Sequence, residues 1–103
     1  MPYNKMKIRK KRGETMTLRH FRIFAAVCKE GGVTKAAKSL YLAQPAVSLA
    51  VRELEEHYGV RLFDRIGRRL YLTQAGKEFL RYTERILALC DELETGARKR
   101  SAS

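Results

Sequence analysis

The polar side of one helix-forming segment carries the residues whose types and spacing could do chemistry. Within residues 43–54, Val47, Val51 and Leu54 recur at helical spacing and form one apolar stripe. The opposite side offers an amide, a hydroxyl and a guanidinium, which can reach base edges and phosphates in a DNA major groove. These outward residues are Gln44, Pro45, Ser48, Leu49 and Arg52. An ordinary amphipathic surface helix would show the same pattern, so the flanking sequence must decide between the two interpretations.

A group of arginines follows in a segment with the pattern of a β-hairpin. Two short extended runs, near residues 61–64 and 69–72, flank a turn around Gly67. The arginines at or near this turn are Arg65, Arg68 and Arg69. Three such cations on one small hairpin predict a wing that contacts phosphates or a minor groove. A solvated basic turn is the alternative.

The elements that must position these groups begin with a helix predicted over residues 17–30. Thr17 is the expected N-cap, and Gly31 with Gly32 would stop the helix. The expected apolar stripe consists of Leu18, Phe21, Phe24 or Ala25, and Cys28. We expect His20 to be a surface or capping side chain, because no second metal ligand lies near it in the sequence.

A short second helix is predicted over residues 33–41. Its inward residues would be Ala36, Ala37 and Leu40. Its outward residues near the start are Thr34, Lys35 and Lys38. A hydroxyl at a helix N-terminus and neighbouring lysines can hold a phosphate, although a solvated face would also explain the lysines. A very short connection then leads through Ala43, a poor N-cap, to a helix over residues 44–58. The pair predicts a helix-turn-helix whose second helix enters the major groove.

A long helix is predicted over residues 73–95, with Thr73 as its cap. Its apolar residues alternate at spacings of four and three, like the a and d positions of a coiled coil. A small winged domain cannot cover so long a stripe, so we expect residues 73–93 to pair with a second copy. The dimer interface would consist of Phe79, Tyr82, Ile86, Leu89 and Leu93. A helix packed wholly inside the monomer is the alternative.

The composition narrows the class of protein. The 103-residue chain has 22 Lys and Arg against 11 Asp and Glu, and its formal charge of +11 attracts polyanions, of which nucleic acid is the first candidate. No apolar run is long enough to predict a helix that spans a membrane. The N-terminus is polar and basic and lacks an apolar core segment, so we do not expect it to be a secretory signal. The well-separated Cys28 and Cys90 suit a reducing cytoplasm. Because no metal-ligand cluster, phosphate-binding glycine loop or catalytic triad occurs, we expect neither an enzyme nor a cofactor or metal site.

The two ends of the chain are basic. Residues 1–15 hold six Lys or Arg with little to bury, so we expect a mobile tail. This tail either lies along phosphates as a basic arm or precedes a natural start at Met16. Residues 96–103 are expected to be a disordered basic tail. Between the tails we expect a DNA-binding domain over residues 16–72 and a linker helix over residues 73–95.

Several short motifs stand out within residues 16–95. They are Gln44-Pro45-Ala46-Val47-Ser48, Leu54-Glu55, Gly59, Leu62-Phe63-Asp64-Arg65 and Leu72-Thr73-Gln74-Ala75-Gly76. Together they resemble the N-terminal DNA-binding domain of LysR-type transcriptional regulators. The resemblance implies a mainly α winged helix-turn-helix, with three helices and a two-stranded wing, followed by a long helix that mediates dimerisation. It also implies the roles of individual residues: Gln44, Pro45 and Ser48 facing DNA, Thr34 holding a phosphate, and Arg65 as the wing arginine.

The sequence departs from this family's pattern at three positions. Leu49 stands where many members carry a polar residue, and Gly32 and Ala43 stand where serine is common. These departures affect base preference and the strength of helix caps, and they leave the fold unchanged.

The leading hypothesis is sequence-specific binding of double-stranded DNA by a bacterial transcription regulator. Such a regulator would bind a dyad-symmetric site as a homodimer. Family members also carry an effector-binding domain for which this chain has no room, so no small-molecule effector site is expected. Two other classes of function stay open: a non-specific nucleic-acid binder driven by charge, and an interaction module that pairs with full-length regulators.

Overall fold

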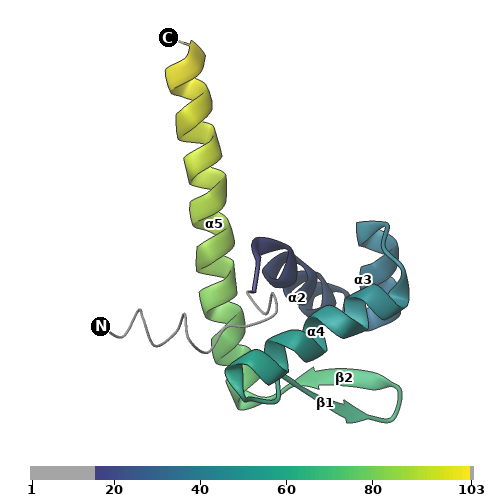
Figure 1. Cartoon of the computed structure of the whole chain (residues 1–103). Coiled ribbons are helices and arrows are strands. Elements are labelled where there is room, and N and C mark those ends of the chain that lie inside the picture. The colour runs from purple at the N-terminus through teal and green to yellow at the C-terminus, as the bar shows by residue number, and fades with distance from the viewer. Residues whose placement is uncertain (1–15, 103) are drawn as a thin grey trace.

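The computed structural model describes the main chain of residues 16–102 and the side chains of residues 16–100. Its elements, in chain order, are α2 (Leu18–Glu30), α3 (Val33–Leu40), α4 (Gln44–Tyr58), β1 (Phe63–Ile66), β2 (Arg69–Leu72) and α5 (Gln74–Ala102). The three shorter helices and the hairpin form one body, from which α5 projects as a long rod (Figure 1). The predicted mainly α fold, a winged helix-turn-helix followed by a long helix, is therefore confirmed. The predicted N-terminal tail, residues 1–15, lies outside the described residues.

Local sequence sets where the helices begin and end. Thr17 caps α2 in a capping box: its Oγ1 accepts the His20 N–H at 3.4 Å, and its own N–H donates to the His20 Nδ1 at 3.1 Å. Gly31 and Gly59 end α2 and α4 in the left-handed conformation that glycine adopts without strain. Tyr41 ends α3 in the same region, with φ 58°, although a side chain there costs about 1–2 kcal/mol. The turn between α3 and α4 is therefore strained.

Two apolar clusters hold the body together. The first, between α2, α3 and α4, consists of Ile23, Val27, Ala36, Ala37, Val47 and Ala50. The second joins α2, α4, the hairpin and α5 through Phe24, Leu54 and Leu62. The stripe predicted for the first helix was therefore partly wrong, since Ile23 and Val27 are buried while Leu18 is exposed. Because α2 packs against α3 and α4 as well as α5, its apolar face is wider than a single stripe.

The hairpin is antiparallel and pairs Phe63 with Leu72 and Ile66 with Arg69. Gly67, with φ 63°, is the first residue of its two-residue loop, where such hairpins need positive φ. The first strand begins two residues later than the predicted 61–64. Arg61 and Leu62 are held instead by bonds to Glu55 and Thr73, outside the strand ladder.

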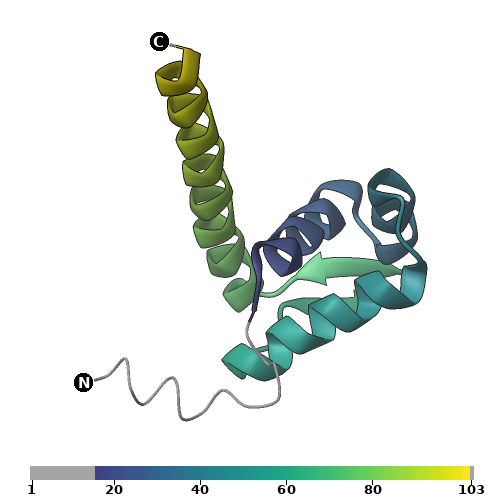
Figure 2. The same ribbon diagram turned by 45° about the horizontal axis from the view of Figure 1, so that its top comes forward.

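Helix α5 is continuous from Gln74 to Ala102. The predicted end of this helix near residue 95 is therefore wrong. The predicted disorder of residues 96–103 is also wrong for residues 96–102, and residue 103 lies outside the described residues. Alanine, arginine and lysine are good helix formers, and Lys99 and Arg100 in the last turn complement the negative end of the helix dipole. Figure 2 shows the far half of α5 projecting beyond the other elements, in the same direction as the first half.

Candidate nucleic-acid interface

Helix α4 turns an apolar face inward and a polar face outward. Val47, Ala50 and Leu54 are buried against the rest of the body. The outward residues predicted from the sequence are all exposed: Gln44, Pro45, Ser48, Leu49 and Arg52. Pro45 lies in the first turn, where its missing N–H leaves no helix bond broken. The amide of Gln44 and the hydroxyl of Ser48 therefore lie one turn apart on the same exposed face.

Helix α3 brings a second set of groups to this face. Thr34 and Lys35 are exposed in its first turn. The N-cap, Gly32, makes no side-chain hydrogen bond to the helix. The first N–H groups of α3 are thus not capped by a side chain of the N-cap, and such groups favour an anionic acceptor.

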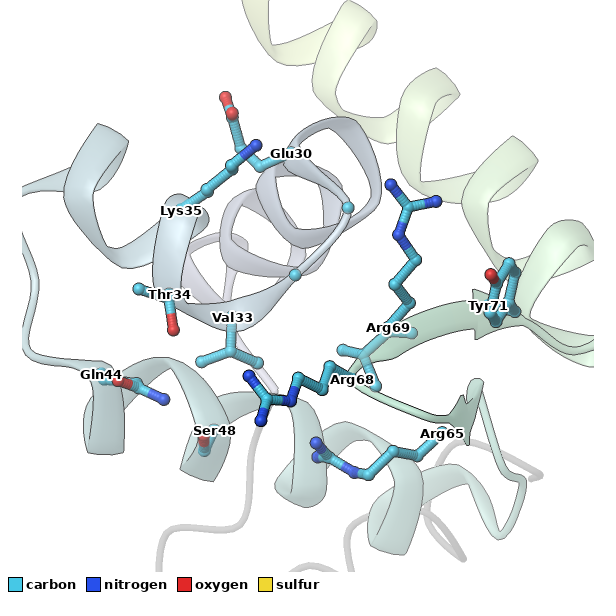
Figure 3. Close-up of a pocket in the computed structure, with 13 residues that line it drawn as sticks. Glu30, Val33, Thr34, Lys35, Gln44, Ser48, Arg65, Arg68, Arg69 and Tyr71 are labelled. Carbon is cyan, nitrogen blue, oxygen red and sulfur yellow. The ribbon is translucent and has the colours of Figure 1, made fainter.

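The hairpin contributes three exposed arginines. Arg65 lies on β1, Arg68 in the loop and Arg69 on β2. Figure 3 shows the side chains of Arg65 and Arg68 reaching from the hairpin toward Ser48, whereas Arg69 extends in a different direction. Two of the three guanidinium groups therefore lie beside the exposed face of α4.

A hollow of about 450 Å³ lies where α3, α4 and the hairpin meet. Seven of the ten predicted contact residues line it: Thr34, Lys35, Gln44, Ser48, Arg65, Arg68 and Arg69. Four of these side chains are cationic, against one acid, Glu30. A smaller hollow of about 250 Å³ adds Arg52 beside Ser48 and Arg65. Pro45 and Leu49 are exposed outside both hollows.

Sequence reasoning missed several residues of the larger hollow. Glu30 ends α2, and Val33 begins α3 directly after the glycine pair. Leu70 and Tyr71 come from β2. The glycine pair signalled a helix end, but nothing in the sequence indicated that this corner would face the hairpin.

Two hydrogen bonds attach α4 to its neighbours on either side. The ring of His20, at the start of α2, lies with its Nε2 2.8 Å from the Glu53 Oε1 on α4. Glu55, also on α4, accepts the N–H of Leu62 through Oε2 at 2.8 Å, just before β1. His20 is thus a capping side chain, as expected, and it also connects two helices. Both bonds limit how far the exposed face of α4 can move relative to α2 and the hairpin.

The family model described as "Bacterial regulatory helix-turn-helix protein, lysR family" matches residues 18–77. The chain belongs to the LysR family. The matched segment covers α2, α3, α4, the hairpin and the first turn of α5, so it includes every element around the two hollows.

Individual LysR-family proteins and solved structures agree with this assignment. A relative named "Probable RuBisCO transcriptional regulator" from Cyanidioschyzon merolae is 53% identical over 76 residues, which is 74% of this chain and 25% of that protein. The chain spans about a quarter of the length of the curated relatives it matches. The crystal structure of the BenM DBD with catB site 1 DNA is similar with a TM-score of 0.82 and 35% identity, over 85% of this chain and 99% of that one. The CbnR DBD–DNA complex is similar with a TM-score of 0.74 and 38% identity, over 84% and 98%.

The stripe predicted for the dimer interface on α5 of this LysR-family chain is divided between two environments. Phe79 packs inside the chain, with its ring centroid 5.2 Å from that of Phe24 and 5.1 Å from that of Tyr58. Further along, Tyr82, Leu89 and Leu93 are 58%, 63% and 73% exposed, and Ile86 is half-buried. Helix α5 is therefore not packed wholly inside the monomer.

The cysteines and the other possible metal ligands do not form a reactive or metal-binding site among the described residues. Both cysteines are free, and burial raises the pKa of Cys28 to about 12, with a smaller contribution from Glu84. A thiol with such a raised pKa is a weak nucleophile at neutral pH. Within the described residues, no group of three His, Cys, Asp or Glu side chains is placed to hold a metal ion. None of the described helices combines the length and apolar character that crossing a membrane requires.

Proposed function

We propose that this LysR-family chain binds double-stranded DNA in a sequence-specific manner, as the DNA-binding part of a transcription regulator. The observation that carries the proposal is the cationic hollow in which α3, α4 and the hairpin meet. Helix α4 lies in a major groove, the start of α3 meets one phosphate backbone, and the hairpin meets the flanking backbone. The similar BenM and CbnR domains, both solved with DNA, support DNA binding by this chain. In a bacterial cell, where the chromosome lies in the cytoplasm, this function would place the chain there.

Base recognition falls to the exposed face of α4. Gln44 can form a bidentate pair with adenine, which is worth about 1–3 kcal/mol of discrimination against another base. The Ser48 hydroxyl can donate to or accept from a base edge. Leu49 supplies an apolar contact suited to the methyl group of thymine. Arg52 and Pro45 complete the face, the first as a cation and the second by fixing the start of the helix.

Phosphate binding falls to the residues around α4. Thr34 and Lys35 on α3, together with Arg65, Arg68 and Arg69 on the hairpin, neutralise and orient the DNA backbone. Each neutralised phosphate releases counterions. A plot of the logarithm of affinity against the logarithm of salt concentration therefore becomes steeper by about 0.9 for each phosphate contact. These contacts fix where α4 sits and carry no base preference themselves.

Dimerisation falls to the exposed part of the α5 stripe within residues 73–93. Tyr82, Ile86, Leu89 and Leu93 pair with the same residues of a second copy, while Phe79 anchors the helix to its own body. A symmetric pair presents two α4 helices to two half-sites, so the preferred DNA has dyad symmetry.

Selection of binding sites from a random DNA pool, followed by titration of the selected duplex and a random duplex at physiological salt, tests the proposal. We expect a selected dyad site that binds at least about 10³-fold more tightly than random DNA. A ratio near one would instead favour a non-specific binder driven by charge. If the chain binds neither duplex, an interaction module that pairs with full-length regulators and does not bind DNA itself would be favoured.

Gln44→Ala tests base recognition by α4. The variant should lose about 1–3 kcal/mol on the selected site, because the bidentate pair is gone, with little change on random DNA. Gln74→Ala, which removes the chain's other glutamine at the start of α5, is the matched control. Equal losses on both duplexes would remove Gln44 from base recognition.

Arg65→Ala tests phosphate binding by the hairpin. The variant should weaken binding to both duplexes and flatten the logarithmic salt dependence by about 0.9 units, the value for one phosphate. Arg19→Ala, an exposed arginine on α2, carries the same loss of charge away from the hollow. An unchanged slope for the Arg65 variant would place its guanidinium away from the backbone.

A further inference from the structure

Four residues at the base of the hairpin connect α4 to α5, and we call them the wing-base cluster: Glu55, Leu62, Thr73 and Gly76. The Glu55 Oε2, on α4, accepts the Leu62 N–H at 2.8 Å. The Leu62 carbonyl in turn accepts the Thr73 N–H at 3.0 Å. Leu62 is fully buried, so water does not compete freely for these bonds. The segment between α4 and β1 is thus bonded to α4 on one side and to the start of α5 on the other.

The hydroxyl of Thr73 joins the same two elements a second time. Its Oγ1 donates to the Arg61 carbonyl at 2.5 Å and accepts the Gly76 N–H at 2.9 Å. The bond from the Gly76 N–H caps the N-terminus of α5. The bond to the Arg61 carbonyl connects this cap to the segment between α4 and β1. One side chain therefore fixes where α5 begins and what it begins against.

Gly76 allows α5 to lie directly on the main chain of Leu62. A Cβ at this position would be 2.2 Å from the Leu62 carbonyl oxygen and 2.8 Å from the Leu72 Cδ2. The first of these atoms is backbone, which cannot move aside as a flexible side chain can. The close approach leaves little freedom for the angle at which α5 departs from the body.

The length of α5 amplifies any change in that angle. At about 1.5 Å per residue, Leu89 lies about 22 Å beyond Gln74 along the helix axis. A tilt of about 10° at the start of α5 would therefore move Leu89 by about 4 Å relative to α4. One base pair spans about 3.4 Å of the duplex, and both copies of a symmetric pair tilt alike, so a tilt of this size can change the half-site separation by about one to two base pairs.

We propose that the wing-base cluster is a specificity determinant that sets the separation of the two DNA half-sites. Its members are positioning residues: they touch no base, and they act by fixing the angle between α4, which reads the DNA, and α5, which holds the second copy. The inference rests on the proposed function, because it requires both DNA reading by α4 and pairing through α5.

Duplexes carrying two copies of the selected half-site, with the spacer varied one base pair at a time, test the inference. The variant is Thr73→Val, which keeps the shape of the side chain and removes both hydroxyl bonds. Thr73→Ser, which keeps the hydroxyl, is the matched control. Binding to a duplex with a single half-site and the melting temperature are measured for each protein alongside the spacing profile.

We expect the wild-type chain and Thr73→Ser to prefer one spacing sharply. In Thr73→Val the preference for that spacing over its neighbours should fall by about threefold to tenfold, the factor that one or two net hydrogen bonds imply. Binding to the single half-site should stay within about twofold of the wild type, because the exposed face of α4 is unchanged.

Three outcomes would overturn the inference. A peaked wild-type profile that Thr73→Val leaves unchanged overturns it and leaves the proposed function standing. A uniform loss by Thr73→Val at every spacing and on the single half-site shows a merely structural role and overturns it as well. A flat wild-type profile, with no advantage of two half-sites over random DNA, overturns the proposed function and the inference together.

Discussion

Helices α4 and α5 both carry an apolar stripe at helical spacing, yet the two stripes lie in different surroundings. On α4, Val47 and Leu54 are fully buried within the chain. On α5, only the first part of the stripe is covered, through Phe79, and by Leu93 the exposed fraction reaches 73%. The same spacing thus marks a face that the described residues cover in one helix and leave open along much of the other.

The starts of the two helices differ as well. Thr73 caps α5 with its hydroxyl, whereas Ala43 has no side chain that could cap α4. Helix α4 is therefore held by packing and by the side-chain bonds of Glu53 and Glu55. Helix α5 is held at its start by the hydroxyl of Thr73, and the described residues leave its stripe exposed at Leu89 and Leu93. The spacing of apolar residues therefore predicts that a helix has an apolar stripe. Whether that stripe is covered depends on how far the neighbouring elements extend along the helix.

The largest expected effect comes from the covered stripe. Leu54→Ala should lower the free energy of unfolding by about 2–5 kcal/mol, because it leaves a cavity in a fully buried site. Leu93→Ala, on the open stripe, should change the unfolding of a monomeric sample by less than about 0.5 kcal/mol. Urea denaturation at dilution below the dimer dissociation constant measures both. Similar losses in the two variants would mean that the stripes do not differ as described.

The open stripe should show its effect in association. Leu89→Glu should raise the dissociation constant of the dimer by about 10- to 100-fold, since it places a charge in the apolar seam. Thr95→Glu adds the same charge on the opposite side of α5 and should leave the dissociation constant nearly unchanged. Sedimentation equilibrium measures both. Equal behaviour of the two variants would move the dimer contact away from this stripe.

The smallest effect concerns the starts of the helices. Ala43→Ser should raise the free energy of unfolding by about 0.5 kcal/mol, at the low end for an N-cap. The gain is small because Pro45 has no N–H to donate and the Ala46 N–H already bonds to the Ala43 carbonyl at 3.0 Å. Thr73→Ala, at the capped start of α5, should cost more than this. Thermal denaturation of the two variants compares the caps, and a larger gain at Ala43 would show that α4 is limited by its missing cap.

Much of the fold could be predicted from sequence because its signals are local. Thr17, Gly59 and Thr73 mark helix boundaries through their own chemistry, and the α4 helix was predicted with its observed bounds. The stripe of α2 was misplaced because a helix that packs on two sides has no single periodic face. The end of α5 was misplaced because a glycine and a basic run indicate a tail only where no long helix precedes them.

The candidate site was predictable where exposure followed from helix faces, as at Gln44 and Ser48. The meeting of α3 with the hairpin was not, because it depends on how segments more than 30 residues apart pack together. Glu30 and Tyr71 entered the hollow through that packing alone. The wing-base cluster was visible only as a family motif in sequence, since the hydrogen bonds of Thr73 and the close approach at Gly76 appear only in three dimensions.

The left-handed backbone of Tyr41 marks a position where a substitution could raise the stability of the domain. Its side chain is 94% exposed, so no described packing repays the strain of the turn. A glycine there would recover about 0.5–1 kcal/mol after its own entropic cost. Substitutions that retune which bases are read usually weaken a protein, and a background with glycine at this turn would tolerate more of them before the domain unfolds.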